Sequence, residues 1–438
     1  MQYLPNIIFA LALAFGIGFF VMNIRKLSRN IKLGKDIDRT DNKPERLKNM
    51  IMIALGQSKM VKRPLSGVLH IIVYVGFIII NIEVLEIIID GLFGTHRIFK
   101  GVLGDTFYGF LIGTFEILAF LVFVAVIIFW LRRNISNIQR FLSKEMNGWP
   151  KNDGNYILYF EMVLMTLFLV MNATDVSFQQ TGIGNVISQF IVPLFDGFSE
   201  ETLHTIERSA WWIHILGILV FLNYLYYSKH LHILLAFPNT YFANLKPKGQ
   251  FTNLESVTKE VKLMMDPDAD PYAMPAEGEE EAEPEKFGAS DVADLNWVQL
   301  MNSYTCTECG RCTSACPANL TGKELSPRNI MMKTRDRLEE VGRNIDANKG
   351  KFVDDGKQLL NDYITPEELW ACTSCNACVE ECPVNIDPLS IIIDMRRYLV
   401  MEESAAPQEL NMMMTNVENN GAPWQYNQQD RLNWANEE

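Results

Sequence analysis

All eight cysteines of this chain stand in two runs that share one spacing. "CTECGRCTSACP" covers residues 306–317 and "CTSCNACVEECP" covers residues 372–383, and both read C-x-x-C-x-x-C-x-x-x-C-P. Thiolates at this spacing bind iron–sulfur cubanes: the first three ligate one cluster, and the fourth, which precedes proline, ligates the other. The two runs therefore predict a pair of 4Fe-4S clusters.

The crossed pattern assigns each cysteine to a cluster. Zinc is the alternative, but a tetrahedral site takes two C-x-x-C pairs and would leave the third cysteine of each run without a role. Two clusters conduct electrons and do not by themselves make or break a substrate bond, so the groups at the two ends decide the chemistry. One cluster is expected on Cys306, Cys309, Cys312 and Cys382, and the other on Cys372, Cys375, Cys378 and Cys316.

Histidine is rare, with six residues in the whole chain. His70 stands near the inner end of the second hydrophobic segment, and His214 and His232 stand in the fifth. On one continuous helix the last two would share a face and lie ~27 Å apart, in opposite leaflets. Facing imidazoles are the usual axial ligands of a b-type haem, and polar residues at membrane depth are mostly functional. His70 and His232, on the same side, are therefore the predicted haem ligands.

His214 has no obvious partner, because "FIIINIEVLE" in the middle of the second segment contains no histidine. Three alternatives stay open: it lines a quinone pocket, it binds a second haem through His204 or His96, or it bonds a neighbour. His230 is expected at the membrane interface beside Lys229, with its polar tip in the headgroups.

Five segments reach the ~20 apolar residues that a spanning helix needs. The run 183–195 is too short and contains a proline, so an interfacial or re-entrant piece is expected there. Carboxylates deep in these segments, above all Glu83 and Glu116, are candidate proton relays for quinone chemistry. The predicted spans are 4–24, 66–90, 107–131, 156–176 and 209–236.

Basic residues set the predicted orientation. Residues 25–63 hold twelve Lys or Arg against four Asp or Glu, and the loop after the third span is also basic. Positively charged loops stay in the cytoplasm. The N-terminus is then outside the inner membrane, its first segment is a retained span, and the cysteine runs are cytoplasmic, where disulfides are rare.

The net charge of −13 argues against nucleic-acid binding, because no basic face remains to neutralise phosphates. The acidity is concentrated in "EGEEEAEPEKF", residues 277–287, which is typical of a solvated linker.

Residues 66–90 and 209–238 resemble the gamma subunit of respiratory nitrate reductase, a five-span cytochrome b that exchanges electrons with quinol. The resemblance rests on "VLHIIVYVGF" and "WIHILGILVFLNYLYYSKHLHILLAFP". It implies that His70 and His232 ligate the haem nearer the cytoplasm and that His214 matches a ligand of an outer haem. The expected partner of His214, ten residues after His70, is Ile80 here.

Residues 295–400 resemble the iron–sulfur subunit of heterodisulfide reductase, whose relatives deliver electrons to subunits with cysteine-rich CCG motifs. All eight cysteines of this chain are used by the two clusters, so the resemblance implies a separate CCG subunit. The tail "NVENNGAPWQYNQQDRLNWA", residues 416–435, is similar to the segment that joins the two domains in fused relatives. Its tryptophans suggest a docking segment.

The expected fold is all-α: a five-helix transmembrane bundle followed by a cytoplasmic α-helical dicluster ferredoxin domain. The expected function is that of a membrane-bound electron-transfer subunit of a quinone-linked oxidoreductase. Its expected cofactors are two 4Fe-4S clusters and one haem b, and a second haem stays open. The expected partner is a CCG subunit, an electron-transfer flavoprotein or another dehydrogenase. Quinone reduction is the favoured direction. Rival hypotheses are a redox-sensing membrane anchor and an assembly factor. The predicted domains are 1–240 (membrane), 241–294 (acidic linker), 295–403 (ferredoxin-like) and 404–438 (docking tail).

Overall fold

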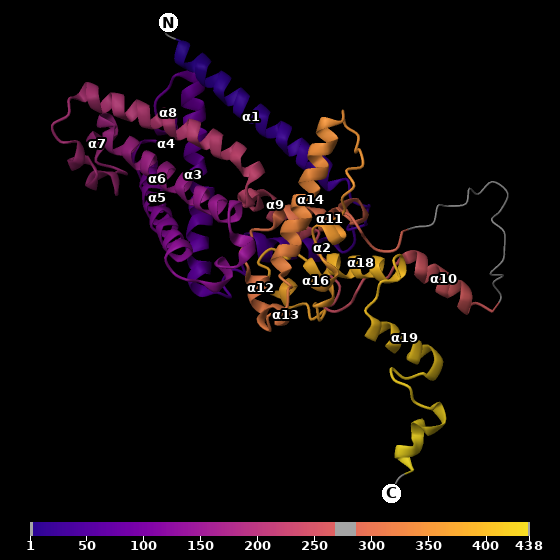
Figure 1. Cartoon of the computed structure of the whole chain (residues 1–438). Helices are drawn as coiled ribbons and strands as arrows, with labels where there is room; N and C mark the ends of the chain where they lie inside the picture. Colours follow the sequence, from indigo (N-terminus) through magenta and orange to yellow (C-terminus); the bar gives the residue numbers. More distant parts are fainter. Residues whose placement is uncertain (1–2, 268–285, 437–438) are drawn as a thin grey trace.

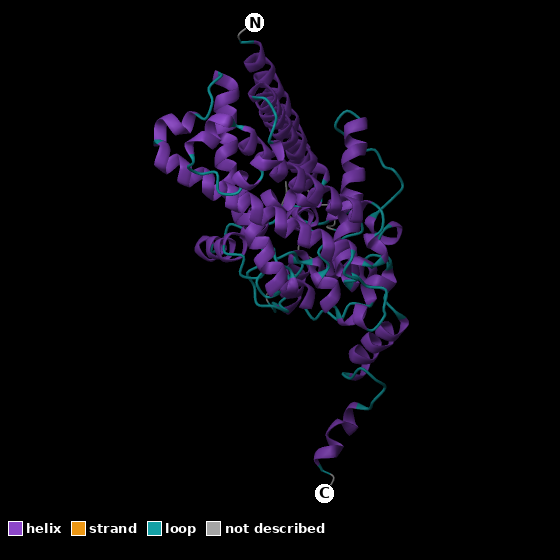
Figure 2. Cartoon of the chain, turned by 90° about the vertical axis from the view of Figure 1, so that its left-hand side faces the viewer, coloured by secondary structure: helices purple, strands orange, loops and turns teal. Residues whose placement is uncertain are grey.

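The computed structural model describes residues 3–267 and 286–436, and within these ranges the chain forms helices and loops without a β-strand (Figure 2). Residues 268–285 of the predicted acidic linker lie outside the described residues. The all-α fold class is therefore confirmed. In Figure 1 the long N-terminal helices gather on one side and the C-terminal helices on the other.

Five helices are long and apolar enough to cross a membrane. Three of them begin with proline at a first-turn position, where no backbone N–H bond is lost. The second of the five helices ends at Phe93 and is followed by Gly94, whose φ of +70° suits glycine at a helix C-terminus. The five are α1 (Leu4–Ile31), α3 (Pro64–Phe93), α5 (Asp105–Asn134), α6 (Trp149–Thr174) and α8 (Glu200–Tyr224).

The core of this bundle forms around α5, where Ile112, Phe115 and Ala119 are almost completely buried. Close approach of α3 to α5 depends on Gly76, since a Cβ there would lie 2.5 Å from a methyl carbon of Val122. Helix α1 is peripheral and exposes large apolar side chains such as Phe15, as expected of a lipid-facing helix.

The fifth predicted span, 209–236, is wrong in its boundaries. Helix α8 starts at Glu200 and, with a short 3-10 turn, ends at Tyr227. Ser228 is extended, with φ −115° and ψ 147°, and its side chain accepts a bond from the backbone N–H of His230. This serine starts a new turn, a preference that hydropathy alone does not report. His232 therefore lies on a separate helix, α9 (His232–Tyr241), and not on the face of the span that carries His214.

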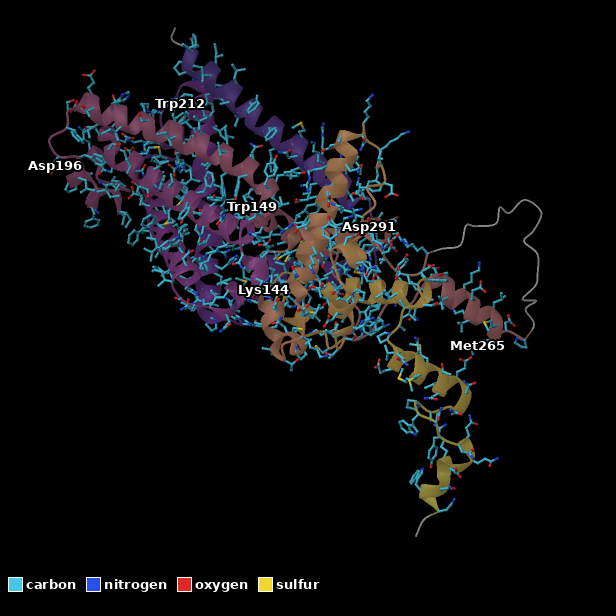
Figure 3. All side chains as sticks on the ribbon, in the orientation of Figure 1. Lys144, Trp149, Asp196, Trp212, Met265 and Asp291 are labelled. Carbon is cyan, nitrogen blue, oxygen red and sulfur yellow. The ribbon has the colours of Figure 1, made fainter. Side chains whose placement is uncertain are left out.

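The run 183–195 forms two 3-10 turns, Ser188–Phe190 and Val192–Phe195, and does not cross the bundle. In Figure 3, Asp196, just after these turns, marks the end of the bundle that lies far from the C-terminal helices. Lys144 and Trp149 mark the opposite end, next to them. The loops at this second end are the basic loops of the sequence.

The C-terminal helices pack around one core. Its side chains include Ile330 and Leu338 of α14 and Ile391 and Met395 of α18. Capping boxes begin two helices, at Asn296 and Thr365. The helices are α11 (Trp297–Thr305), α12 (Arg311–Ala315), α13 (Pro317–Leu320), α14 (Pro327–Ala347), α15 (Leu359–Asp362), α16 (Pro366–Trp370), α17 (Ala377–Glu381) and α18 (Pro388–Met401).

This C-terminal unit packs directly on the basic end of the bundle. Asn30, in the last turn of α1, is buried and donates to the Tyr304 hydroxyl at 3.0 Å. In a short bridge between the two halves, the backbone N–H of Lys35 donates to the Leu295 carbonyl oxygen and that of Trp297 donates to the Lys35 carbonyl oxygen. The cysteine unit is thus held against the membrane helices by buried contacts, and not only by the connecting chain.

Three segments outside the bundle and the C-terminal core also form helices or turns: the first basic loop, the predicted linker and the tail. Helix α2 (Lys43–Met50) and a π-turn (Ile51–Leu55) fill the first basic loop. Helix α10 (Glu255–Met265) lies inside the stretch predicted as linker, and residues 286–294 pack against the ferredoxin-like unit. The tail forms α19 (Gln408–Asn420) and a 3-10 turn (Gln428–Ala435), which project from the body in Figure 1.

Candidate functional site

The first cysteine run wraps one small cavity. Cys306, Cys309, Cys312 and the distant Cys382 all line it. Two residues of the run, Glu308 and Gly310, have φ of 53° and 69°, and these left-handed turns direct the sulfurs to the same side. The structure thus brings together the four cysteines predicted for one cluster, although Cys382 comes 70 positions after Cys312 in the sequence. Cys378, which is predicted for the other cluster, also lines this cavity.

The second run repeats this backbone. Ser374 and Asn376 occupy the positions equivalent to Glu308 and Gly310, and they have φ of 56° and 60°. Burial raises the pKa of Cys378, and the charges of Asp387, Cys372 and Cys316 raise it further. Cys375 is exposed to solvent. The crossed assignment stays a prediction that this arrangement supports.

The thiols sit among groups that suit thiolates bound to iron. Burial raises the pKa of Cys306 to about 12 and that of Cys382 to about 11, so a metal is needed to keep these sulfurs deprotonated near neutral pH. The backbone N–H of Ile386 donates to Cys382 Sγ at 3.3 Å, and that of Ser374 donates to Cys372 Sγ at 3.4 Å. Such bonds tune cluster potentials.

The two predicted haem ligands meet at the basic end of the bundle, on which the C-terminal unit packs. The ring centres of His70 and His232 lie 6.4 Å apart. Two imidazoles that bind one metal from opposite sides have ring centres about 6 Å apart, because each metal–nitrogen bond measures ~2 Å. His232 Nδ1 lies 3.1 Å from the Lys229 carbonyl oxygen, which leaves Nε2 free for a metal. His70 Nδ1 is buried, and within residues 3–267 and 286–436 it has no hydrogen-bond partner. The pair fits haem ligation.

His230 lies beside this pair, with its ring centre 5.3 Å from that of His232 and 5.5 Å from that of Phe221. The interfacial position predicted for His230 is therefore wrong, because its ring lies next to the candidate haem ligands. The spacing H-L-H places alternate residues on opposite sides of a helix, which concealed the contact. It forms because the chain breaks at Ser228.

A buried ion network joins the histidines to the first cysteine run. Glu308, between Cys306 and Cys309, is paired with Lys229 and, at 2.8 Å, with Arg335. Burial would raise the pKa of Glu308, but the two cations hold it below its ordinary value. The Lys229 carbonyl oxygen also accepts a hydrogen bond from His232 Nδ1. Lys229 therefore contacts a candidate haem ligand through its backbone and the loop of the first cysteine run through its side chain. The sequence contained no signal for this link.

A second contact connects the first cysteine run to the helix that carries His70. Arg311 donates to the Lys59 carbonyl oxygen at 3.0 Å, one turn before α3 begins at Pro64. Arg328 donates to the Arg140 carbonyl oxygen at 2.6 Å and pairs with Glu145, in the loop after α5. The first cysteine run therefore faces the membrane helices, whereas Cys375 of the second faces solvent.

His214 lines a cavity of about 70 Å³ inside the bundle. Asn81 and Glu161 are the other polar residues of its wall, and Ile80, the position where a histidine partner would be expected, lies on it too. His214 Nδ1 is buried and has no hydrogen-bond partner among the described residues. His204 stands ten residues earlier on the same helix, ~15 Å along its axis, and cannot be an axial partner. His96 contacts Asp175 at 3.3 Å.

The carboxylates singled out as proton relays, Glu83 and Glu116, are buried inside the bundle. Glu83 has one oxygen without a partner among the described residues. Glu116 accepts bonds from the Asn172 amide and from the backbone N–H of Ile187 and Ser188, so it closes the outer loop over the bundle. The structure thus favours a structural role for Glu116 and leaves Glu83 as the candidate relay.

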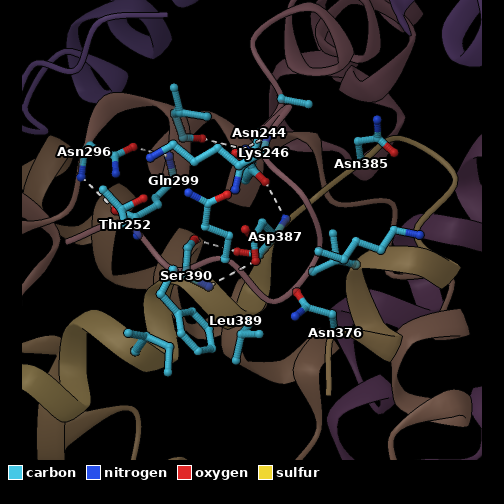
Figure 4. A pocket seen from close by; sticks show the side chains of 18 of the residues that line it. Asn244, Lys246, Thr252, Asn296, Gln299, Asn376, Asn385, Asp387, Leu389 and Ser390 are labelled. Atoms are coloured by element: carbon cyan, nitrogen blue, oxygen red, sulfur yellow. Dashed lines mark hydrogen bonds between the residues drawn. The ribbon is translucent and has the colours of Figure 1, made fainter. Parts of the chain in front are cut away.

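A polar cavity of 420 Å³ lies behind the second cysteine run (Figure 4). Asn376 lines it from that run, and Lys246 and Asp387 line it from elsewhere in the chain. Asp387 accepts from the backbone N–H of Ser390 at 3.0 Å. No cysteine or histidine of the described chain lines this cavity, so it is separate from the candidate cluster and haem sites.

The predicted docking tail has no buried residue among those described. Trp424 is 62% exposed and Trp434 is 74% exposed. Three consecutive methionines, residues 412–414, are exposed on α19. Its role as a docking segment stays a prediction.

Comparisons with known proteins agree with this geometry. Residues 305–386 match the 4Fe-4S dicluster domain family. The chain is 30% identical, over 98% of its length, to the probable iron-sulfur-binding oxidoreductase FadF of Bacillus subtilis and covers 61% of that protein. It is 24% identical to the EtfAB:quinone oxidoreductase of Syntrophomonas wolfei, over 92% of this chain and 55% of that one.

The chain thus spans a little over half the length of these two relatives. A probable membrane-anchored ferredoxin of Chromohalobacter salexigens is 33% identical over 34% of this chain and 24% of that protein. No solved structure matches. Residues 305–386 therefore form a 4Fe-4S dicluster domain, which is joined here to five helices that can cross a membrane.

Proposed function

We propose that this chain is the membrane-bound electron-transfer part of a quinone-linked oxidoreductase. It passes electrons between a cytoplasmic partner, two 4Fe-4S clusters, a b-type haem and a membrane quinone. The observation that carries the proposal is the meeting of His70 and His232 at the end of the bundle that holds the first cysteine run, with Lys229 contacting both sites. When bound, the clusters and the haem each accept and donate single electrons.

The chain's own residues hold these groups in a defined order. Cys306, Cys309 and Cys312 face the membrane helices, and Arg311 fixes their loop to the start of α3. The exposed Cys375 marks the end of the path where a soluble partner can approach. The contacts of the first run with the membrane helices and the exposure of Cys375 support a path that leads from solvent to the bundle.

Quinone is proposed to react at the His214 cavity. A few polar groups in an otherwise apolar wall are typical of a site that orients a small ring. Asn81, Glu161 and His214 supply such groups, and Asn81 and the neighbouring Phe77 are exposed on the surface that faces lipid. A quinone can therefore enter from the bilayer, and the unpartnered His214 Nδ1 is available to a quinone oxygen.

The proposed orientation places the cysteine unit in the cytoplasm and the N-terminus outside the inner membrane. The basic loops, which are retained in the cytoplasm, lie at the end of the bundle where the cysteine unit is bound. We propose quinone reduction as the direction, with a CCG-type subunit, an electron-transfer flavoprotein or another dehydrogenase as donor. The name of the Syntrophomonas wolfei relative, EtfAB:quinone oxidoreductase, supports this choice.

The test is the cofactor content of the purified full chain, together with its spectrum before and after reduction by a quinol analogue. We expect about eight non-haem irons, as two 4Fe-4S clusters require, and one b-type haem that the quinol analogue reduces. Eight irons without haem would refute the proposal and favour the redox-sensing anchor. Two haems would mean that His214 is a haem ligand and not part of a quinone site.

A further inference from the structure

A buried arginine stands inside the first cysteine run. Arg311 lies between Cys309 and Cys312, at the first position of α12, and it is 4% exposed. Its guanidinium donates to the Lys59 carbonyl oxygen at 3.0 Å, to the Met60 carbonyl oxygen at 3.4 Å and to Met60 Sδ at 3.5 Å. These acceptors are neutral, and Arg311 makes no ion pair with any residue of the described chain.

The other charged residues of the cluster cavity do have counter-charges. Glu308 and Arg328 line the cavity together with Arg311. Glu308 is held by the two cations described above, and Arg328 pairs with Glu145 at 2.7 Å. A buried charge is costly unless an opposite charge lies beside it. Among the described residues of this cavity, Arg311 is therefore the cation whose counter-charge the polypeptide does not supply.

The first cluster can supply this counter-charge. Four thiolates around a 4Fe-4S core leave a net negative charge, and reduction adds one more. Burial lowers the pKa of Arg311, whereas Cys309 and Cys382 raise it when they are charged. Both cysteines are predicted ligands of the first cluster, so negative charge on that cluster acts on the Arg311 guanidinium.

The second cysteine run has no such group between its ligands. Its backbone repeats that of the first run, and Ala377 occupies the position equivalent to Arg311. A cation beside the second run, Arg396, comes from α18 and is only half-buried. It donates to the Cys372 carbonyl oxygen at 2.5 Å and lies 4.9 Å from the centre of the Trp370 ring. The two ligand loops thus differ in the charge that they carry.

Arg311 also lies toward the helix of a candidate haem ligand. Met60, which accepts from Arg311, packs against Gly67 of α3, where a Cβ would lie 2.9 Å from the Met60 carbonyl oxygen. Gly67 comes three residues before His70, about one helical turn. The positive charge of Arg311 is thus located on the side of the first cysteine run that faces the membrane helices.

We propose that Arg311 is the counter-charge of the first cluster and raises its reduction potential, so that an electron is held at the face against the membrane helices. A fixed positive charge stabilises the reduced cluster more than the oxidised one, because the reduced cluster carries more negative charge. This inference rests on the proposed function, since it requires both clusters. It adds a residue that favours the membrane-facing cluster as the place where an electron rests.

The test is an EPR-monitored redox titration of the full chain in detergent, with Cys306→Ser used to identify the signal of the first cluster. At a fixed potential, Arg311→Gln should raise the ratio of oxidised to reduced first cluster about tenfold, which corresponds to a potential about 59 mV lower for one electron. The second cluster should shift less, because the cysteines that act on Arg311 are ligands of the first. Arg311→Lys keeps the charge and should titrate like the wild type.

Arg396→Gln is the matched control, because Arg396 contacts the second run. It should shift the second cluster and leave the first unchanged. If Arg311→Gln does not assemble the first cluster, Ala377→Arg tests the same charge at the equivalent position and should raise the potential of the second cluster.

Three results would overturn the proposal. The first is an unchanged potential of the first cluster in Arg311→Gln. The second is the same shift in Arg311→Lys, because lost hydrogen bonds and not lost charge would then be the cause. The third is an unchanged second cluster in Ala377→Arg. All three would leave the proposed function intact, whereas a wild type without two iron–sulfur signals would refute the proposed function itself.

Discussion

Replacing Lys229 with methionine should weaken the attachment of the first cysteine run to the membrane helices. The Lys229 side chain is 9% exposed and that of its partner Glu308 is 2% exposed. Removing one partner of a buried ion pair costs ~3–5 kcal/mol because the other charge stays buried. Arg335 still contacts Glu308 at 2.8 Å, so the lower end, ~3 kcal/mol, is expected. That corresponds to a loss of about a hundredfold in the folding equilibrium.

The assay is urea denaturation of the full chain in detergent, followed through its iron–sulfur absorbance. Lys229→Met should lower the midpoint, and Lys229→Arg should retain most of the stability because it keeps the charge. The double variant Lys229→Met with Glu308→Gln should recover at least half of the loss, since the carboxylate is then neutral. The haem spectrum should persist, because His232 bonds to the backbone carbonyl of residue 229 and not to its side chain.

Wild-type stability in Lys229→Met would refute the reasoning. So would a double-mutant cycle in which the two losses simply add. In either case the close approach of Lys229 and Glu308 would contribute nothing to holding the two halves together, and Arg335 alone would neutralise the carboxylate.

Three further outcomes are expected. His232→Ala should abolish the haem absorbance and leave the non-haem iron content intact, whereas unchanged haem would exclude the proposed ligand pair. Cys316→Ser should change the EPR signal of the cluster held by the second cysteine run. A change confined to the signal of the first run's cluster would disprove crossed ligation. The lowered pKa of Glu308 stabilises the fold fully above about pH 4.5 and less as the pH falls through its folded pKa, so the unfolding free energy should decrease in acid. Glu308→Gln should remove this part of the pH dependence, and an unchanged acid profile in that variant would show that other carboxylates cause it.

The sequence alone predicted the chemistry of the cysteines. Their local spacing is enough to predict cluster binding, because three thiolates separated by two residues each can bind the same cluster. The five long apolar helices were predicted for a similar reason, because the need to satisfy every backbone group in lipid leaves few alternatives. Both depend on short-range patterns.

The end of the fifth span was missed because apolar composition continues through it. The break at Ser228 comes from a side chain that bonds its own backbone, and the hydropathy of the flanking tyrosines and leucines conceals it. The same break brings His230 beside His232, which no helix-face argument predicts.

Only the tertiary structure decided how the two halves meet. His70 and His232 are 162 positions apart in the chain. Their ring centres lie 6.4 Å apart because α3 and α9 converge at the basic end of the bundle. Lys229 and Glu308 read as an ordinary surface lysine and an ordinary glutamate of a cysteine loop. Burial at a shared interface makes them partners, because a charge removed from water must find a counter-charge, and the sequence does not state which one lies opposite.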